Sequence, residues 1–289
     1  MEPEIKYCAF IDVLGYGEFV LNEDRSTEQT IKLLHSQYVN LATHFTLVVP
    51  RLNAYYSSDI FLRSFSDSFY MDCSSLEVLL IAVKTIFDYT IGFYASFTET
   101  EERTPLLRCG IVKDWLLKFR DIGSMTSSGG ELNPVGRAVV RAYQTSEKTW
   151  LSGMRIILHP DAFMDLNALE STLPAFPCFA KEVREYGVAM YYYFKHILHD
   201  ERIERRKGDD DQTDLYELLW PVGRLNDDPA ECVTFLRKIK ENIPENVIRH
   251  HRKTANLFHE SFMLSSWRTK NQELYTRLQG ELAAMLPVS

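Results

Sequence analysis

The chain has 289 residues, of which 45% are hydrophobic and 25% are charged, a profile that fits one large globular domain or a medium domain with an appendage. Its formal net charge of −8 argues against non-specific nucleic-acid binding, which needs clustered cations. We expect a cytoplasmic protein with no membrane span, because no signal-peptide pattern opens the sequence and charged residues interrupt its longest apolar region, 76–97.

Strand and helix patterns alternate over the first part of the chain. Residues 5–14 are rich in strand formers and predict a buried strand that carries Asp12 near its end. The polar run Ser66-Asp67-Ser68 predicts a tight turn between two short strands. The predicted strands are 5–14, 60–65, 69–72 and 106–113, and the predicted helices are 27–48 and 75–94. This order matches a ferredoxin-like α+β sandwich, whose helices cover one face of a mixed or antiparallel sheet.

The later elements are expected to extend this sheet and then to add helices. Residues 115–122 predict an antiparallel neighbour of the preceding strand, and the Ser- and Gly-rich residues 123–134 predict a loop. A helix at 136–150 and strands at 155–159 and 188–194 follow. The predicted parts are an α+β domain over 1–200, a charged linker over 201–226 and a C-terminal helical appendage over 227–289.

Asp12 and Asp67 are the principal candidates for chemistry. In a ferredoxin-like sheet the first strand and the middle hairpin are adjacent, so the two carboxylates are expected to face each other. Close carboxylates repel, and a divalent cation such as Mg²⁺ or Mn²⁺ removes that penalty. Their spacing alone favours a plainer interpretation, in which Asp12 caps a loop and Asp67 is a turn residue. The five scattered cysteines predict reduced thiols and no zinc site.

Four short segments stand in order along the chain: FIDVLGY at 10–16, FSDS at 65–68, LRCGI at 107–111 and GRAVVRA at 136–142. They resemble, in turn, the F-x-D-I-x-G-F strand, the metal-binding hairpin, the R-x-G-I strand and the G-x-x-V-N-x-A-x-R helix of class III nucleotidyl cyclases. Ser66 departs from the pattern, because the family has Gly there. The chain most resembles the pyrimidine cyclases of bacterial Pycsar anti-phage defence.

The resemblance implies a lyase that converts UTP, in preference to CTP, to the 3′,5′-cyclic monophosphate and pyrophosphate. It implies two Mg²⁺ or Mn²⁺ ions per site, held by Asp12, Asp67 and the carbonyl of Val13. It also implies a head-to-tail homodimer whose two sites are each built from both chains. The product would be a second messenger in anti-phage immunity, acting on a separate cyclic-nucleotide effector.

One part of the family pattern is missing. Val140 and Gln144 stand where purine cyclases carry the Asn and Arg that stabilise the transition state. Arg137 and Arg141 share a helix face at i, i+4 and are candidates to supply the lost positive charge. The alternative is a solvated basic face.

The remaining nucleotide-binding candidates come from the same comparison. Arg63 aligns with the base-reading Lys of purine cyclases, and Asn133 aligns with their second base contact. Asn offers both a donor and an acceptor to a pyrimidine edge. The other candidates for contact with the nucleotide are Gly15, Tyr16 and Gly17 after the first strand, and Tyr55 and Tyr56 before the hairpin.

Two other functions remain open from the sequence. The first is a purine cyclase of the same fold, which Arg63 in place of Lys disfavours. The second is a catalytically silent nucleotide-binding module, which the missing Asn and Arg favour and the retained carboxylate pair disfavours.

Overall fold

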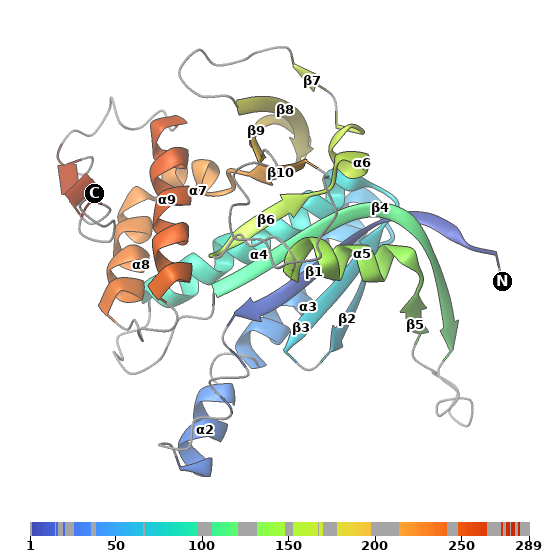
Figure 1. The fold of residues 1–289 in the computed structure, drawn as a ribbon, viewed down its shortest axis with the longest axis horizontal. Coiled ribbons are helices and arrows are strands. Elements are labelled where there is room, and N and C mark those ends of the chain that lie inside the picture. Colours follow the sequence, from blue (N-terminus) through green and yellow to red (C-terminus); the bar gives the residue numbers. More distant parts are fainter. Residues whose placement is uncertain are drawn as a thin grey trace, which may run out of the picture.

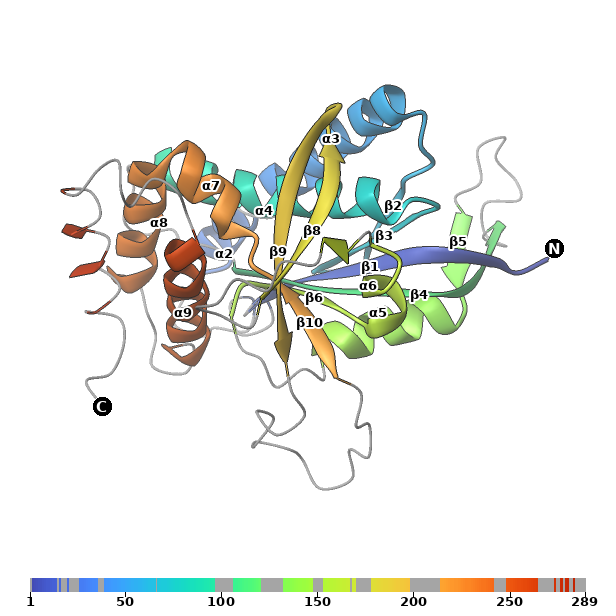
Figure 2. The same ribbon diagram turned by 90° about the horizontal axis from the view of Figure 1, so that it is seen from above.

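The computed structural model describes residues 2–14, 16, 20, 26–35, 39–65, 67–96, 106–120, 132–147, 153–166, 168–169, 178–197, 214–241, 248–264, 273, 276–277, 279–280 and 283. One mixed sheet runs through these residues in the order β2-β3-β1-β4-β6-β10-β9-β8-β7, and β5 pairs with β4 (Figure 1). Helices lie on both sides of the sheet (Figure 2). The chain therefore has the α+β architecture that the sequence predicted.

The first part of the fold is the predicted ferredoxin-like unit. Its elements are β1 (Glu4–Leu14), α2 (Thr27–Leu34), α3 (Asn40–Tyr56), β2 (Phe61–Phe65), β3 (Ser68–Cys73), α4 (Leu76–Ser96) and β4 (Leu106–Arg120). The strands β2, β3, β1 and β4 are neighbours and pair antiparallel. Buried residues of β1, among them Ala9 and Ile11, form the main core with α3 and α4. The predicted element order is confirmed, and these two helices cover one face of the sheet (Figure 2).

β4 is a single strand of 15 residues. Its pairing with β1 is continuous from Leu106 opposite Leu14 to Leu116 opposite Glu4. The predicted break before residue 115 is therefore wrong. The antiparallel neighbour of the far end of β4 is β5 (Leu132–Val135), in a segment that the sequence predicted as loop.

α5 (Arg137–Glu147) packs on the other face of the sheet, over β4 and β1. A close approach at Gly110 makes this packing possible, because a Cβ there would lie 2.5 Å from the carbonyl oxygen of Ala142 and the backbone nitrogen of Ser146. A small buried cluster holds the two layers together and consists of Cys8, Tyr70, Val112, Leu116, Ala138 and Ala142. This face also carries the charged residues of the candidate site.

The second half of the chain extends the same sheet. Its elements are β6 (Arg155–Leu158), α6 (Pro160–Phe163), β7 (Ala168–Leu169), β8 (Cys178–Glu185), β9 (Val188–Ile197), β10 (Leu215–Leu218), α7 (Pro221–Asp227), α8 (Pro229–Glu241) and α9 (Ile248–Leu264). β6 runs parallel to β4, and β10 lies between β6 and β9. β10 and all of α7 but its last residue fall within the segment 201–226 that the sequence predicted as a linker, so the described part of this segment forms a strand and a helix.

The C-terminal helices share the core of the sheet. The ring of Trp220 lies 5.3 Å from that of Phe87 in α4 and 5.7 Å from that of Phe258 in α9. α8 packs along α4. The predicted helical appendage is therefore joined to the rest of the described chain through buried aromatic side chains. No helix in the described residues has the length and apolar character needed to cross a membrane.

Candidate functional site

Asp12 and Asp67 lie side by side at one end of the sheet. Asp12 stands opposite Ser68 in the β1–β3 pairing, and the backbone nitrogen of Val13 donates to the carbonyl oxygen of Asp67 at 3.3 Å. The Ser68 hydroxyl lies 3.4 Å from Oδ1 of Asp12 and 3.4 Å from Oδ1 of Asp67. One hydroxyl therefore lies between two carboxylates that are 55 positions apart in the chain.

Arg108 forms the cationic side of this site. Its Nη2 donates to Oδ2 of Asp12 at 3.0 Å and to Oε1 of Glu147, the last residue of α5, at 2.9 Å. Burial raises the pKa of the Asp12 carboxyl above its usual value, against the opposing charge of Arg108. The nearby carboxylates of Glu147 and Asp67 raise this pKa further. The site thus crowds negative charge that one guanidinium only partly neutralises.

The donor set of this site is a pair of carboxylates. No group of three or more His, Cys, Asp or Glu side chains converges on one point within the part of the chain that the structure describes. Asp12 and Asp67 offer oxygen atoms alone, which suits Mg²⁺ or Mn²⁺ and disfavours softer ions. Further ligands for such an ion would have to come from backbone carbonyls, water or a phosphorylated ligand.

Arg137 and Arg141 converge on a different carboxylate. Nε of Arg137 lies 2.9 and 2.8 Å from the two oxygens of Asp114, and Arg141 also forms an ion pair with Asp114. Arg141 further contacts Asp161 at 2.8 Å and the ring of His159 at 2.9 Å. Burial would raise the pKa of Asp114, but hydrogen bonds from Arg141, Arg137 and the backbone lower it.

These arginines are far from Asp12 within one chain. Asp114 lies six residues beyond Arg108 in the same strand, which is about 20 Å at the rise of an extended chain. Asn133 stands opposite Phe119, eleven residues beyond Arg108, or about 35 Å along the strand. The structure therefore does not bring Arg137, Arg141 and Asn133 to the Asp12 of their own chain.

Arg63 lies nearer to the carboxylate pair. It pairs with Tyr70, which in turn pairs with Phe10, so that Arg63 is on the same sheet face as Asp12. Its guanidinium lies 6.0 Å from the ring centroid of Phe65. Tyr16 packs against the main core, while Gly15 and Gly17 lie outside the described residues.

Tyr55 and Tyr56 end α3 and contact the β8–β9 hairpin. The ring of Tyr55 lies 5.2 Å from that of Tyr186, and the hydroxyl of Tyr56 accepts a hydrogen bond from the backbone nitrogen of Tyr186. They precede β2, whereas Asp67 follows it, so the length of β2 separates them from the carboxylate pair. The structure does not place them beside Asp67.

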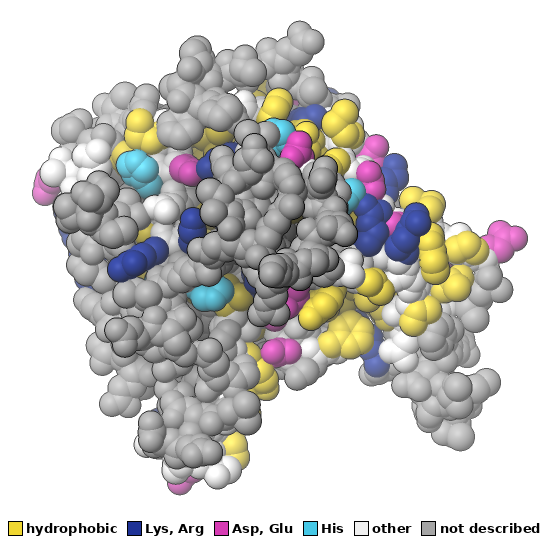
Figure 3. Space-filling model, in the orientation of Figure 1, with side chains coloured by type: hydrophobic (Ala, Val, Ile, Leu, Met, Phe, Trp, Pro, Cys, Tyr) yellow, Lys and Arg dark blue, Asp and Glu magenta, His cyan; other side chains and the backbone are white. Residues whose placement is uncertain are grey.

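Several hydrophobic side chains of α5 and of the strands β2 and β5 are exposed. They are Phe65, Val135, Val140 and Tyr143, with exposed fractions between 37% and 53%. Hydrophobic side chains gather on the face seen in Figure 3, in the region of α5, β2 and β5.

Sequence reasoning did not single out Ser68, Glu147 or Asp114. Arg108 is in the sequence motif LRCGI, which predicted a strand but no role for this side chain. The only sequence signal for a role of Arg108 is its charge within an apolar strand. The strand register is needed to place Arg108 opposite Asp12. Glu147 and Asp114 owe their positions to the packing of α5 on β4, which no local pattern shows.

No family model and no curated protein sequence matches the chain. Solved structures that resemble it include guanylyl and adenylyl cyclases. The guanylyl cyclase Cya2 has a TM-score of 0.48 at 10% identity, over 75% of this chain and 93% of that one. The adenylyl cyclase CyaB from P. aeruginosa has a TM-score of 0.46 at 12% identity, over 75% and 96%.

A third similar structure is the guanylyl cyclase domain of the RhoGC fusion protein from the aquatic fungus Blastocladiella emersonii. It has a TM-score of 0.44 at 11% identity, over 76% of this chain and 98% of that one. With TM-scores below 0.5 and identities of 10–12%, these similarities assign no activity to this chain.

Proposed function

We propose that this chain is a nucleotide cyclase that converts UTP, in preference to CTP, to its 3′,5′-cyclic monophosphate and pyrophosphate. The observation that carries the proposal is the pair Asp12 and Asp67, whose Oδ1 atoms each lie 3.4 Å from the Ser68 hydroxyl. The same residues lie in the segments FIDVLGY and FSDS that resemble the metal-binding segments of class III cyclases.

The residues present fit a divalent cation. Asp12 and Asp67 would hold two Mg²⁺ or Mn²⁺ ions together with the carbonyl of Val13. Burial is the main cause of the raised pKa of Asp12, and the carboxylates of Glu147 and Asp67 add to it, so a cation would stabilise the ionised form. When bound, such ions would supply Lewis-acid activation of the ribose 3′-hydroxyl and neutralise the phosphates.

The chain's own residues bind and orient the nucleotide in this proposal. The ribose 3′-oxygen attacks the α-phosphorus, the bond from that phosphorus to the bridging oxygen of the β-phosphate breaks, and the hydroxyl proton passes to solvent. Arg137 and Arg141 would stabilise the charge that develops on the phosphates, for which the planar guanidinium is suited. Arg63 and Asn133 would contact the pyrimidine edge.

The proposed site needs two copies of the chain. Arg137 and Arg141 bind Asp114, about 20 Å along β4 from Arg108, which stands opposite Asp12. Asn133 lies opposite a position about 35 Å along β4 from Arg108. These three residues can therefore serve only a nucleotide held by another copy. A head-to-tail homodimer supplies two such composite sites by symmetry. The exposed hydrophobic side chains of Val140 and Tyr143 on α5 support this arrangement.

The product would act as a messenger on a separate effector, which in the resembling Pycsar systems serves anti-phage immunity. We therefore expect no stable complex between this chain and its effector. The surface formed by α5 and its neighbouring strands would be buried in the dimer, and the nucleotide would lie within that interface.

The decisive experiment is incubation of the purified protein with UTP, CTP, ATP or GTP and either Mn²⁺ or Mg²⁺, followed by mass analysis of the products. Cyclic UMP with less cyclic CMP is expected. Asp67→Ala should abolish turnover. Asp165→Ala is the control and should keep turnover, because Asp165 is a surface residue that accepts a hydrogen bond from Lys113. Cyclic AMP or cyclic GMP alone would overturn the pyrimidine preference and establish a purine cyclase.

One observation favours a second function, a catalytically silent nucleotide-binding module. Arg108 already forms an ion pair with Asp12 at 3.0 Å, which relieves part of the repulsion without a metal. In that case the dimeric protein would bind a nucleoside triphosphate, measured by calorimetry, and release no cyclic product with either cation.

A further inference from the structure

The ammonium group of Lys118 lies over the strands β2 and β3. Lys118 is in the end of β4 that curves and pairs with β5 (Figure 1). Its Nζ donates to Oδ1 of Asp72 in β3 at 2.6 Å and lies 4.5 Å from the centroid of the Phe61 ring in β2. The far end of β4 therefore brings a cation to a part of the sheet with which β4 itself does not pair.

Lys118 and Arg63 belong to one surface. Phe61 packs against the small buried cluster beneath α5, so it lies on that face of the sheet. Arg63 is two positions further along β2, and the alternation of side chains places it on the same face. Lys118, which lies over the Phe61 ring, is thus close to the residue that the proposed function assigns to the pyrimidine edge.

The ammonium group of Lys118 is accessible, whereas its carboxylate partner is not. The side chain of Lys118 is 20% exposed and that of Asp72 is fully buried. Burial raises the pKa of Asp72, against the opposing charge of Lys118. An ammonium group has three N–H donors, and Asp72 and the Phe61 ring together occupy at most two of them. A ligand that approaches this surface therefore meets a fixed hydrogen-bond donor.

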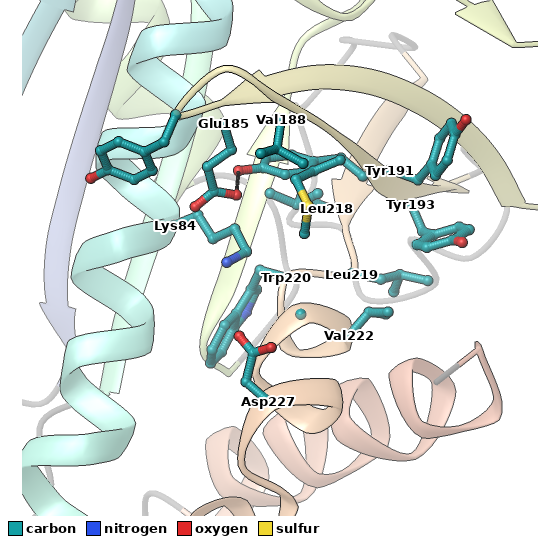
Figure 4. A pocket seen from close by; sticks show the side chains of 14 residues that line it. Lys84, Glu185, Val188, Tyr191, Tyr193, Leu218, Leu219, Trp220, Val222 and Asp227 are labelled. Atoms are coloured by element: carbon teal, nitrogen blue, oxygen red, sulfur yellow. Dashed lines mark hydrogen bonds between the residues drawn. The ribbon is translucent and has the colours of Figure 1, made fainter. Parts of the chain in front are cut away.

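A second lysine, Lys84, lines a cavity of about 290 Å³ but is not available in this way (Figure 4). Its amine points between the carboxylates of Glu185 and Asp227 and forms an ion pair with Asp88 at 2.6 Å. Burial would lower the pKa of Lys84, but these three carboxylates raise it above its usual value. Lys84 is therefore held by its own neighbours, whereas Lys118 has a single ion-pair partner among the described residues.

The two pyrimidines differ at position 4 of the ring. Uracil has a carbonyl oxygen there, which accepts hydrogen bonds, and cytosine has an amino group, which donates them. A lysine side chain only donates, and a charged donor binds a carbonyl oxygen strongly. A lysine beside position 4 therefore favours uracil and leaves the amino group of cytosine facing a cation.

We infer that Lys118 determines the choice of uracil over cytosine by donating to O4 of the base, while Asp72 and Phe61 hold its ammonium group in place. The inference rests on the proposed function, in which a nucleotide held by the carboxylate pair of the other copy lies with its base against this surface. It adds a third base contact to Arg63 and Asn133 and gives the preference for UTP a physical cause.

The test measures, by calorimetry with the full-length protein and Mn²⁺, the affinities for the α,β-methylene analogues of UTP and CTP, in which the bond to the β-phosphate does not break. The wild type should bind the UTP analogue more tightly. Lys118→Gln should lower the ratio of the two affinities about tenfold, or 1.4 kcal/mol, because glutamine can accept from the amino group of cytosine. Asp72→Asn combined with Lys118→Gln avoids an unpaired buried carboxylate and should lower the ratio equally.

Lys113→Gln is the matched control, because Lys113 is in the same strand on the opposite face, where it pairs with Asp165 at 2.8 Å. It should leave the ratio unchanged. An unchanged ratio in both Lys118 variants would overturn the inference, as would failure of the wild type to bind either analogue at about 1 mM. Turnover of UTP and CTP is measured separately. A wild type that binds the analogues but forms no cyclic product would contradict the proposed cyclase activity, and the affinity ratio would still test Lys118.

Discussion

Nη2 of Arg108 lies 3.0 Å from Oδ2 of Asp12, and both side chains are largely buried. Arg108→Ala would leave the carboxylates of Asp12 and Glu147 without this cation. We expect the free energy of unfolding to fall by about 3 kcal/mol in metal-free buffer, as for other broken buried pairs. Added Mn²⁺ should restore part of the loss, because it would replace the missing positive charge.

Urea titrations with EDTA or with Mn²⁺ measure both effects. Lys113→Ala removes a half-exposed pair with Asp165 and serves as control, with a loss of at most about 1 kcal/mol that does not respond to Mn²⁺. Equal responses of the two variants to Mn²⁺ would contradict a cation site at Asp12.

Gly110 sets the distance between α5 and the sheet. Gly110→Ala would place a Cβ 2.5 Å from backbone atoms of Ala142 and Ser146, so the helix must move. We expect a loss of about 1–3 kcal/mol, as for overpacked cores, together with loss of turnover. Gly92→Ala is the control, since its Cβ would meet only the side chains of Glu231 and Arg224. A wild-type Tm for Gly110→Ala would contradict the described packing.

Two inactive variants should complement each other if the site is shared between chains. Asp67→Ala removes the carboxylate half, and Arg141→Gln removes a cation that lies far along β4 from it. An equimolar mixture after dissociation and reassociation should recover about a quarter of wild-type turnover, because half the dimers contain one intact site. Each variant taken alone through the same dissociation and reassociation gives the baseline. No recovery from well-folded dimers would argue against composite sites.

Asp114 links the acid stability of the fold to α5. Its folded pKa is below the value of about 3.9 in unfolded chains, so its stabilisation is present above that pH and is lost as the pH falls through the folded pKa. Asp114→Asn should therefore cost about 2–3 kcal/mol at pH 7 and less at pH 3. Urea unfolding at both pH values measures the difference. A cost that is equal at both would show that the charge of Asp114 is not the cause.

His44 should make the fold sensitive to mildly acidic pH. Its ring stacks on Tyr89 at 3.4 Å, and burial, with Arg51 nearby, lowers its pKa from 6.5 to about 4. Between these values the unfolded chain takes up a proton that the folded chain does not, so stability decreases as pH falls from 6.5 to 4. His44→Phe keeps the stacking and should flatten this profile in denaturant titrations. At pH 8 His44 is neutral in both states, so the difference in free energy of unfolding between His44→Phe and wild type measures the change in packing alone.

Local patterns were sufficient to predict the elements around the carboxylate pair. The strand before Asp12, the hairpin at Asp67 and the amphipathic helix after it each have a clear period, and a ferredoxin-like order makes the first two adjacent. The position of Ser68 between them depends on register, which is fixed by the burial of one face.

The sequence could not show where distant contacts override local signals. Asp114 and Lys113 suggested the end of a strand, yet β4 continues because α5 supplies two guanidinium groups to Asp114 from 23 and 27 residues later. β8 has the sequence CFAKEVRE, in which charged residues at several positions mask the alternation of apolar and polar side chains that predicts a strand. β10 has four residues beside a charged run, too few for a periodic pattern.

The place of β10 has a consequence for synthesis and handling of the protein. This strand occupies an interior position of the sheet, between β6 and β9, although residues 215–218 follow all the other described strands along the chain. A nascent chain that ends before residue 215 exposes two unpaired strand edges facing each other. Such edges invite aggregation and slow, non-local folding. Truncation at residue 200 should therefore give insoluble protein during expression, whereas the full chain closes its own sheet.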